Sequence, residues 1–221
     1  MAMLEQLQAQ LAALPPGTTK HDMESGFEVM AQWIQELSGA RRTELLSELP
    51  TWLEEAHPWH SRAVMEIALR LGDQQLLAAA AREARRRGVH DLAERDEYQP
   101  WLIFHLDLLS TISRWHGDPG PEARAYLREL RGGAAATSYS RRLLAIRAWF
   151  TECLLESAER RKQCLSQGLT ELRKWHQPRL LRSGLSLLHV YFGSSAEGVA
   201  NLKEVLTSDE WAMAFPELSA S

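Results

Sequence analysis

Several histidine, cysteine and acidic side chains carry groups that could bind a metal or act as nucleophiles. His57 and His60 are three residues apart and follow two glutamates, a spacing that could place both imidazoles on one face of a helix. Pro58 lies between them, however, and a proline interrupts a regular helix. No HExxH pattern, glycine-rich phosphate loop, GxSxG or CxxC motif occurs in the chain. We therefore predict no metal, no cofactor and no catalytic residue, and expect a protein that is not an enzyme.

The two cysteines, Cys153 and Cys164, lie eleven residues apart. If one continuous helix carried both, their separation along its axis would be about 16 Å, which is too far for a disulfide. We expect both to be small core residues. Whether the apolar pattern from 139 to 176 belongs to one helix or to two stays open, because no proline or strong turn divides it.

Two polar side chains lie inside the most apolar stretch of the chain, about 100–116. These are His105 and Asp107, and we predict that both are buried polar groups. They point to different sides of a helix because they are two residues apart, so each needs a partner from elsewhere. A ligand pocket around His105, Trp101 and Trp115 is one alternative for this region.

Charge is distributed unevenly along the 221 residues, although the net charge is only −4. Residues 1–60 hold three basic and nine acidic residues, whereas residues 134–182 hold ten basic and four acidic ones. A basic zone between acidic ends can steer an acidic partner. The zone supplies most of our predicted binding residues, to which we add Trp59 because it lies at a helix junction. The complete predicted set is Trp59, Arg141, Arg142, Arg160, Arg161 and Lys162.

A third arginine group, Arg82 and Arg85–Arg87, falls in the last turns of a predicted helix. Cations there are favoured by the helix dipole, which is sufficient to explain them.

The elements that must position these residues are helices. Leu and Ala dominate, apolar residues recur at helical spacing, and no stretch alternates as a strand does. We predict an all-α protein of about ten or eleven helices, forming a single domain with a possible hinge near 132–138. Both a helical-repeat stack and an irregular bundle fit this pattern. The predicted helices span about 2–14, 22–38, 40–53 divided near Pro50, 61–71, 74–87, 100–116, 121–131, 139–157, 159–176, 178–192 and 195–206.

Two patterns favour the stack. The dipeptide Trp-His occurs at residues 59, 115 and 175, which indicates a period near 58 residues. In addition, the segment from Leu53 to Gly88 resembles a HEAT-type repeat, with two amphipathic helices joined by the turn Arg70-Leu71-Gly72-Asp73. This resemblance covers about 35 of the 221 residues and implies an α-solenoid with a concave binding face.

Three functions compete on this basis. The first is a protein-binding module, as a bacterial immunity or inhibitor-type protein or a chaperone-like partner, that binds an acidic protein surface. The second is a HEAT-like nucleic-acid enzyme similar to the alkylpurine DNA glycosylases, with Trp149, Trp175 and Glu152 in a basic channel. The third is a helical ligand-sensing or regulatory domain. The negative net charge argues against nucleic acid.

No apolar run approaches the roughly 18 residues of a membrane span, and the N-terminal segment has no signal-peptide pattern. We therefore expect a cytoplasmic protein that binds no membrane.

Overall fold

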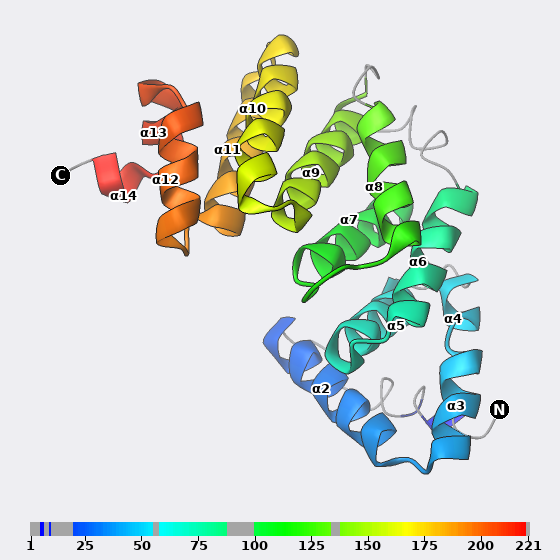
Figure 1. The fold of residues 1–221 in the computed structure, drawn as a ribbon. Helices are drawn as coiled ribbons and strands as arrows, with labels where there is room; N and C mark the ends of the chain where they lie inside the picture. The colour runs from blue at the N-terminus through cyan, green and yellow to red at the C-terminus, as the bar shows by residue number, and fades with distance from the viewer. Residues whose placement is uncertain are drawn as a thin grey trace. The chain divides into compact units, whose positions relative to one another are not determined.

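The computed structural model describes residues 5, 6, 9, 20–54, 58–87, 100–133 and 138–219 (Figure 1). Within these ranges the chain forms helices and no strand, which confirms the predicted all-α class. Most of the predicted helix at 2–14, and the segment 134–137 of the predicted hinge, lie outside the described residues. The helices are α2 (Lys20–Glu36), α3 (Gly39–Glu48), α4 (Thr51–Glu54), α5 (Pro58–Leu71), α6 (Gln74–Arg87), α7 (Pro100–Ser113), α8 (Pro121–Gly132), α9 (Tyr139–Leu155), α10 (Ala158–Lys174), α11 (Pro178–Phe192), α12 (Ala196–Val205), α13 (Ser208–Ala214) and α14 (Pro216–Ser219).

The chain divides into two compact units. Unit 1 comprises residues 1–87 and 103–123, and unit 2 comprises residues 88–102 and 124–221. The boundary between residues 102 and 103 falls within α7, and the boundary between residues 123 and 124 falls in the first turn of α8. The sequence was compatible with an irregular bundle or a helical stack. Unit 1 resembles the bundle, and unit 2 resembles the stack.

Unit 1 is built around α5. Helices α2, α4 and α6 all pack against it, and residues 63–68 of α5 are all buried. Pro50 separates α3 from α4, as predicted. Gly72 adopts a φ of +62° in the turn after α5, a conformation that glycine tolerates best. The Asp73 carboxylate then accepts bonds from the backbone amides of Gln75 and Leu76, so this side chain caps the N-terminus of α6.

Helix α7 is as thoroughly covered as its composition predicts, although it ends three residues earlier than expected. Phe104, Leu108, Leu109 and Ile112 are buried, and none of the side chains from 102 to 113 is exposed. Because the polar residues in this stretch are also at least half-buried, the helix has no solvated face of its own.

Unit 2 is a two-layer stack of helices. Helices α9 and α11 run parallel, because Tyr139 lies beside Ser183 at their starts and Thr151 lies beside Tyr191 at their ends. Helix α10 runs in the opposite direction and packs against both α9 and α11, which also contact each other. Helix α12 packs against α10 and α11 (Figure 1). At Gly184 a Cβ atom would lie only 2.5 Å from a methyl carbon of Leu172, so the glycine allows α11 to approach α10 closely.

The break between α9 and α10 corrects our expectation for the cysteines. The chain turns at Glu156 and Ser157, and the two helices form an antiparallel hairpin. Cys153 and Cys164 consequently face each other, with their Cα atoms 5.5 Å apart, and form a disulfide. The assumption of one continuous helix, which placed the sulfurs three turns apart, is wrong for this segment.

The structural repeat also differs from the predicted one. Helices α9 and α11 begin at residues 139 and 178, so equivalent parallel helices of unit 2 start 39 residues apart, not about 58. Trp59-His60 lies in the first turn of α5, whereas Trp115-His116 and Trp175-His176 follow the ends of α7 and α10. The three dipeptides therefore do not occupy equivalent positions, and they do not mark a repeat.

Two helix caps in unit 2 further refine the sequence interpretation. Ser195 caps α12 by accepting a bond from the Gly198 amide. A full capping box, which we did not predict, begins α13 with Thr207 and Glu210. Within the described residues, no helix has both the length and the apolar character needed to cross a bilayer.

Candidate functional site

The predicted binding arginines divide between the two ends of one hairpin. Arg141 and Arg142 lie in the first turn of α9, whereas Arg160, Arg161 and Lys162 lie at the start of α10. Because α9 and α10 are antiparallel and about 25 Å long, these groups lie at opposite ends. They cannot form the single surface that their closeness in sequence suggested.

The start of α10 is largely occupied by contacts within the protein. Arg161 pairs with Glu197 at 3.0 Å and donates to the Glu156 carbonyl oxygen. Lys162 forms an ion pair with Glu204. These pairs join α10 to α12, whereas Arg160 is exposed.

The opposite end of the hairpin gathers basic and aromatic side chains from three helices. The Arg142 guanidinium lies over the Trp175 ring at 5.6 Å, and that of Arg179 lies over the Tyr139 ring at 5.0 Å. Such contacts hold a planar cation in place without neutralising its charge. We define the basic end of unit 2 as Arg141, Arg142, Arg179 and Arg182, together with Tyr139 and Trp175.

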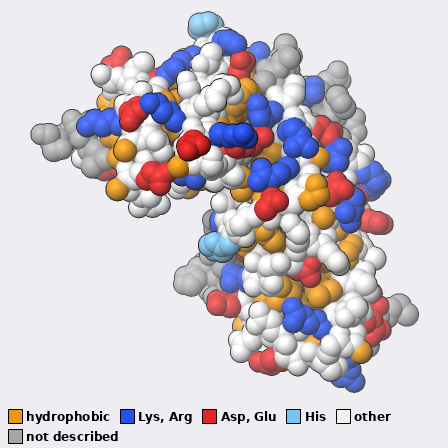
Figure 2. Space-filling model, viewed as in Figure 1, with side chains coloured by type: hydrophobic (Ala, Val, Ile, Leu, Met, Phe, Trp, Pro, Cys, Tyr) orange, Lys and Arg blue, Asp and Glu red, His pale blue; other side chains and the backbone are white. Residues whose placement is uncertain are grey.

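Two carboxylates of unit 2 are engaged by cations other than those of the basic end. Glu171 is paired with Lys174, and Glu210 binds Arg173 through two hydrogen bonds of 2.6 and 2.8 Å. The Arg173 contact lowers the pKa of Glu210, because the ion pair and the Thr207 amide outweigh the effect of burial. Figure 2 shows Lys and Arg side chains spread over the visible face of unit 2, with Asp and Glu side chains among them.

Two helix N-termini add to the positive potential at the basic end. The N-cap residues of α9 and α11, Ser138 and Gln177, make no side-chain hydrogen bond to the helix that they precede. Since α9 and α11 are parallel, the positive ends of both helix dipoles lie on the same side as the arginines. By contrast, the nearby N-terminus of α13 is satisfied by its own Glu210.

Two of the four arginines of the basic end were missed by the sequence analysis. Arg179 and Arg182 are exposed on α11, and they fall inside the basic segment 134–182. Their partners could have been identified from the distance between helix starts, since Tyr139 and Arg179 are one 39–40-residue step apart. The Trp-His spacing of about 58 residues does not match this 39-residue distance between helix starts.

The other predicted residues have structural surroundings or lie beyond what is described. The Trp59 side chain and His57 are outside the described residues. His60 stacks on the buried Trp52 ring at a centroid distance of 4.8 Å. His105 is buried as predicted, whereas Asp107 is only half-buried, which corrects the prediction for that residue. Burial lowers the pKa of His105 to about 4, so its imidazole is neutral at pH 7.

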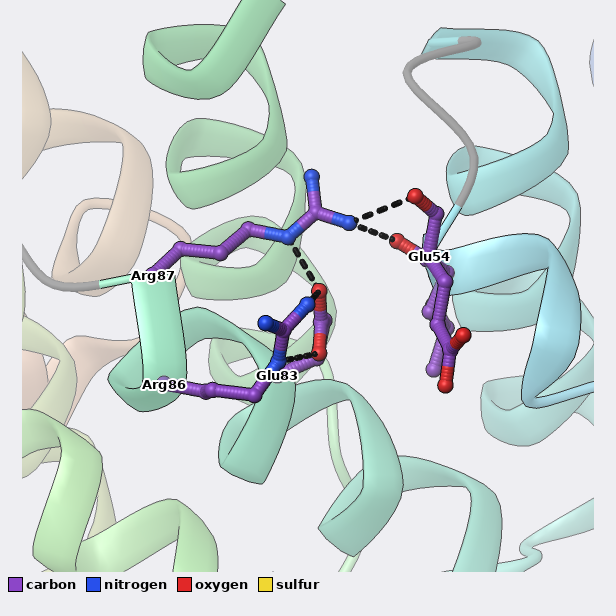
Figure 3. Close-up of polar contacts among 5 residues, drawn as sticks. Glu54, Glu83, Arg86 and Arg87 are labelled. Carbon is purple, nitrogen blue, oxygen red and sulfur yellow. Dashed lines mark hydrogen bonds and ion pairs between the residues drawn. The ribbon is translucent and has the colours of Figure 1, made fainter.

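Arg86 and Arg87 of the third arginine group make contacts within the fold (Figure 3). The buried Glu83 accepts hydrogen bonds from Arg86 and Arg87, and Arg87 also donates to the carbonyl oxygens of Leu53 and Glu54 at 2.9 and 2.8 Å. Burial raises the pKa of Glu83, but these two arginines more than offset it and the net shift is downward. Arg87 thus caps the C-terminal end of α4.

The residues of the glycosylase-like alternative do not form a channel in unit 2. Glu152 is engaged in an ion pair with Arg131, whose guanidinium lies 4.1 Å over the Trp149 ring. The Trp149 indole donates to the Cys164 carbonyl oxygen, whereas Trp175 lies at the basic end. Glu152 and Trp149 are therefore both occupied by contacts within the protein.

No group of side chains suited to hold a metal ion is found among the described residues. Within them, no three His, Cys, Asp or Glu side chains gather closely enough to hold an ion. Unit 1 has a cleft lined by Glu28, Ala31, Gln32, Gln35 and Arg70, on α2 and α5 rather than around His105. The Trp101 side chain is outside the described residues.

The basic end therefore combines four arginines and two aromatic rings at one end of unit 2. Comparison of the chain with protein-family models, with curated proteins and with solved structures finds no match in any of the three.

Proposed function

We propose that this chain is a non-enzymatic protein-binding module, and that the basic end of unit 2 binds an acidic surface of its partner. The observation that carries the proposal is the convergence of Arg141, Arg142, Arg179 and Arg182 on one end of the stack, with two of them laid on aromatic rings. A stoichiometric partner, of the immunity, inhibitor or chaperone type, requires such a surface and no catalytic group.

Arginine over an aromatic ring is well suited to protein recognition. The ring restricts the guanidinium before the partner arrives, so less side-chain freedom is lost on binding. Arg, Trp and Tyr are also the residue types that most often dominate binding energy at protein interfaces. Arg142 with Trp175, and Arg179 with Tyr139, are two such pairs on adjacent helices.

The same geometry favours a protein over nucleic acid. A nucleic-acid surface needs cations that follow phosphates over a long path. In unit 2 the cations of α10 that would extend the path, Arg161 and Lys162, are paired with glutamates of α12. The basic end is compact, and a compact cationic patch matches a local cluster of carboxylates.

The direct experiment measures binding of a fluorescent, glutamate-rich peptide to the full chain by anisotropy, with a neutral peptide of equal length as reference. We expect salt-sensitive binding to the acidic peptide, because surface charges are screened within about 10 Å at 0.1 M salt. Reversal of Arg141, Arg179 and Arg182 to Glu should weaken that binding at least tenfold.

The matched control is Arg160→Glu, which reverses an exposed arginine of the same hairpin at its opposite end. This variant should bind the acidic peptide nearly as well as the wild type. Equal losses from both sets of reversals would reject the basic end as the site. Tighter binding to a single- or double-stranded oligonucleotide than to the acidic peptide would favour the nucleic-acid alternative.

A further inference from the structure

The disulfide of unit 2 joins two cysteines in very different surroundings. Cys153, on α9, is completely buried, whereas Cys164, on α10, is only half-buried. Thiol–disulfide exchange requires a thiolate to reach a sulfur atom along an open path. Of the two residues, Cys164 is the one that a small thiol or disulfide in solution can approach without unfolding of the hairpin.

The two cysteines are also held together by contacts other than their own bond. The Trp149 indole nitrogen donates to the Cys164 carbonyl oxygen at 3.2 Å, which ties α9 to α10 at this point. One turn further along α10, a Cβ atom at Gly168 would lie 2.9 Å from the Trp149 ring, so the helices are in close contact there. Reduction would therefore leave the two thiols facing each other, ready to form the bond again.

From these observations we propose that Cys153 and Cys164 form a reversible redox-active pair, in which Cys164 reacts first and Cys153 resolves the intermediate. The oxidant is a low-molecular-weight disulfide of the glutathione type. This assignment is independent of the partner proposed for the basic end, which lies at the other end of the hairpin.

The chemistry proceeds in two exchange steps. The Cys164 thiolate attacks one sulfur of the small disulfide, forms a mixed disulfide with it and releases one thiolate. The buried Cys153 then attacks the Cys164 sulfur, forms the intramolecular bond and releases the second thiolate. The protein loses two electrons and two protons, and the small disulfide gains them as two thiols.

The test uses the full chain and two single variants, Cys153→Ser and Cys164→Ser. Each protein is reduced, freed of reductant and treated with oxidised glutathione under native conditions, and its mass is followed with time. We expect Cys153→Ser to accumulate one glutathione on Cys164, at a rate at least ten times that of Cys164→Ser. The wild type should lose two hydrogens and retain no glutathione, because Cys153 displaces it.

Circular dichroism of all three reduced proteins controls for folding, and the reduced wild type should keep its helix content. The proposal is overturned if Cys164→Ser reacts as fast as Cys153→Ser, since Cys153 would then be equally accessible. It is also overturned if the folded, reduced wild type stays reduced in oxidised glutathione, or if it accumulates the mixed disulfide without forming the intramolecular bond.

Discussion

The two units use arginine side chains in different ways. In unit 1 the buried carboxylate of Glu66 forms an ion pair with Arg114, and that of Glu83 forms one with Arg87. The Glu66 pair joins α5 to the residue after α7, and Arg87 also joins α6 to α4 through the Leu53 carbonyl oxygen. In unit 2 a similar pair, Glu210 with Arg173, fixes the start of α13. At the basic end, by contrast, the Arg142 and Arg179 guanidinium groups lie over aromatic rings, and the Arg179 and Arg182 side chains are exposed.

This difference shows that the number of arginines in a segment indicates little about their use. A guanidinium that donates to a buried carboxylate is part of the fold, because removal of either partner leaves the other unsatisfied. A guanidinium over a ring keeps its charge for an external ligand. Substitutions in both units, and a change of pH, test this contrast.

The largest effect should come from cavities in the two cores. Leu109→Ala in unit 1 and Leu169→Ala in unit 2 each remove a completely buried side chain, and each should lower the free energy of unfolding by about 2–5 kcal/mol. Urea denaturation followed by circular dichroism measures both. A loss below about 1 kcal/mol for Leu109→Ala would show that α7 is not a core element.

Acid should destabilise unit 1 at a higher pH than unit 2. His105 has a folded-state pKa of about 4, against 6.5 when unfolded, because burial disfavours its charged form. The unfolded chain therefore binds the proton more readily, and about 3 kcal/mol of stability, fully present above pH 6.5, is lost as the pH falls towards 4. In unit 2, Arg173 lowers the pKa of Glu210, so the stability that this ion pair contributes is lost only as the pH falls below 4.5, the ordinary value of the carboxyl group.

Urea denaturation at pH 7.0 and 5.0 measures this loss, with His105→Gln as the control variant. The variant should have the smaller pH dependence over this range, because it has no imidazole to protonate. An equal pH dependence in both proteins would contradict the assignment.

A smaller effect is expected from the ion pair shown in Figure 3. Glu83→Gln keeps the shape of the side chain but removes the charge that Arg86 and Arg87 bind, and it should cost about 1–2 kcal/mol. The unit 2 counterpart, Glu210→Gln, should cost a similar amount. Thermal unfolding of both variants at pH 7 provides the measurement, and no change in either midpoint would show that these pairs do not stabilise the fold.

The smallest effect on stability should come from the basic end. Arg182→Ala removes an exposed side chain and should change the free energy of unfolding by less than about 0.5 kcal/mol. Arg87→Ala removes the cap of α4 and should cost about 2 kcal/mol. Comparable losses in the two variants, measured by urea denaturation, would remove the distinction between structural and surface arginines.

Most helices could be predicted from local signals in the sequence. Prolines and glycines such as Pro50, Gly72 and Gly193 mark helix boundaries, because their backbone constraints act regardless of tertiary packing. The break between α9 and α10 contains neither proline nor glycine, because the chain turns at Glu156 and Ser157, so the sequence left open whether one helix or two span this segment. The disulfide was missed for the same reason.

The candidate site could be predicted only in part. The sequence identified Arg141 and Arg142, which belong to the basic end, but grouped them with Arg160, Arg161 and Lys162. Charge density along a chain does not reveal that two antiparallel helices separate neighbours by their full length. The role of Trp175 under Arg142 depends on a contact across 33 residues, which no local pattern encodes.

The disulfide has a mechanical consequence for unit 2. If the chain is pulled from its two ends, the residues between Cys153 and Cys164 carry no tension while the bond is intact. Eleven residues reach at most about 40 Å when extended, whereas the two Cα atoms lie 5.5 Å apart. The fully stretched oxidised chain should therefore be roughly 30 Å shorter than the reduced one, a difference that single-molecule force spectroscopy resolves.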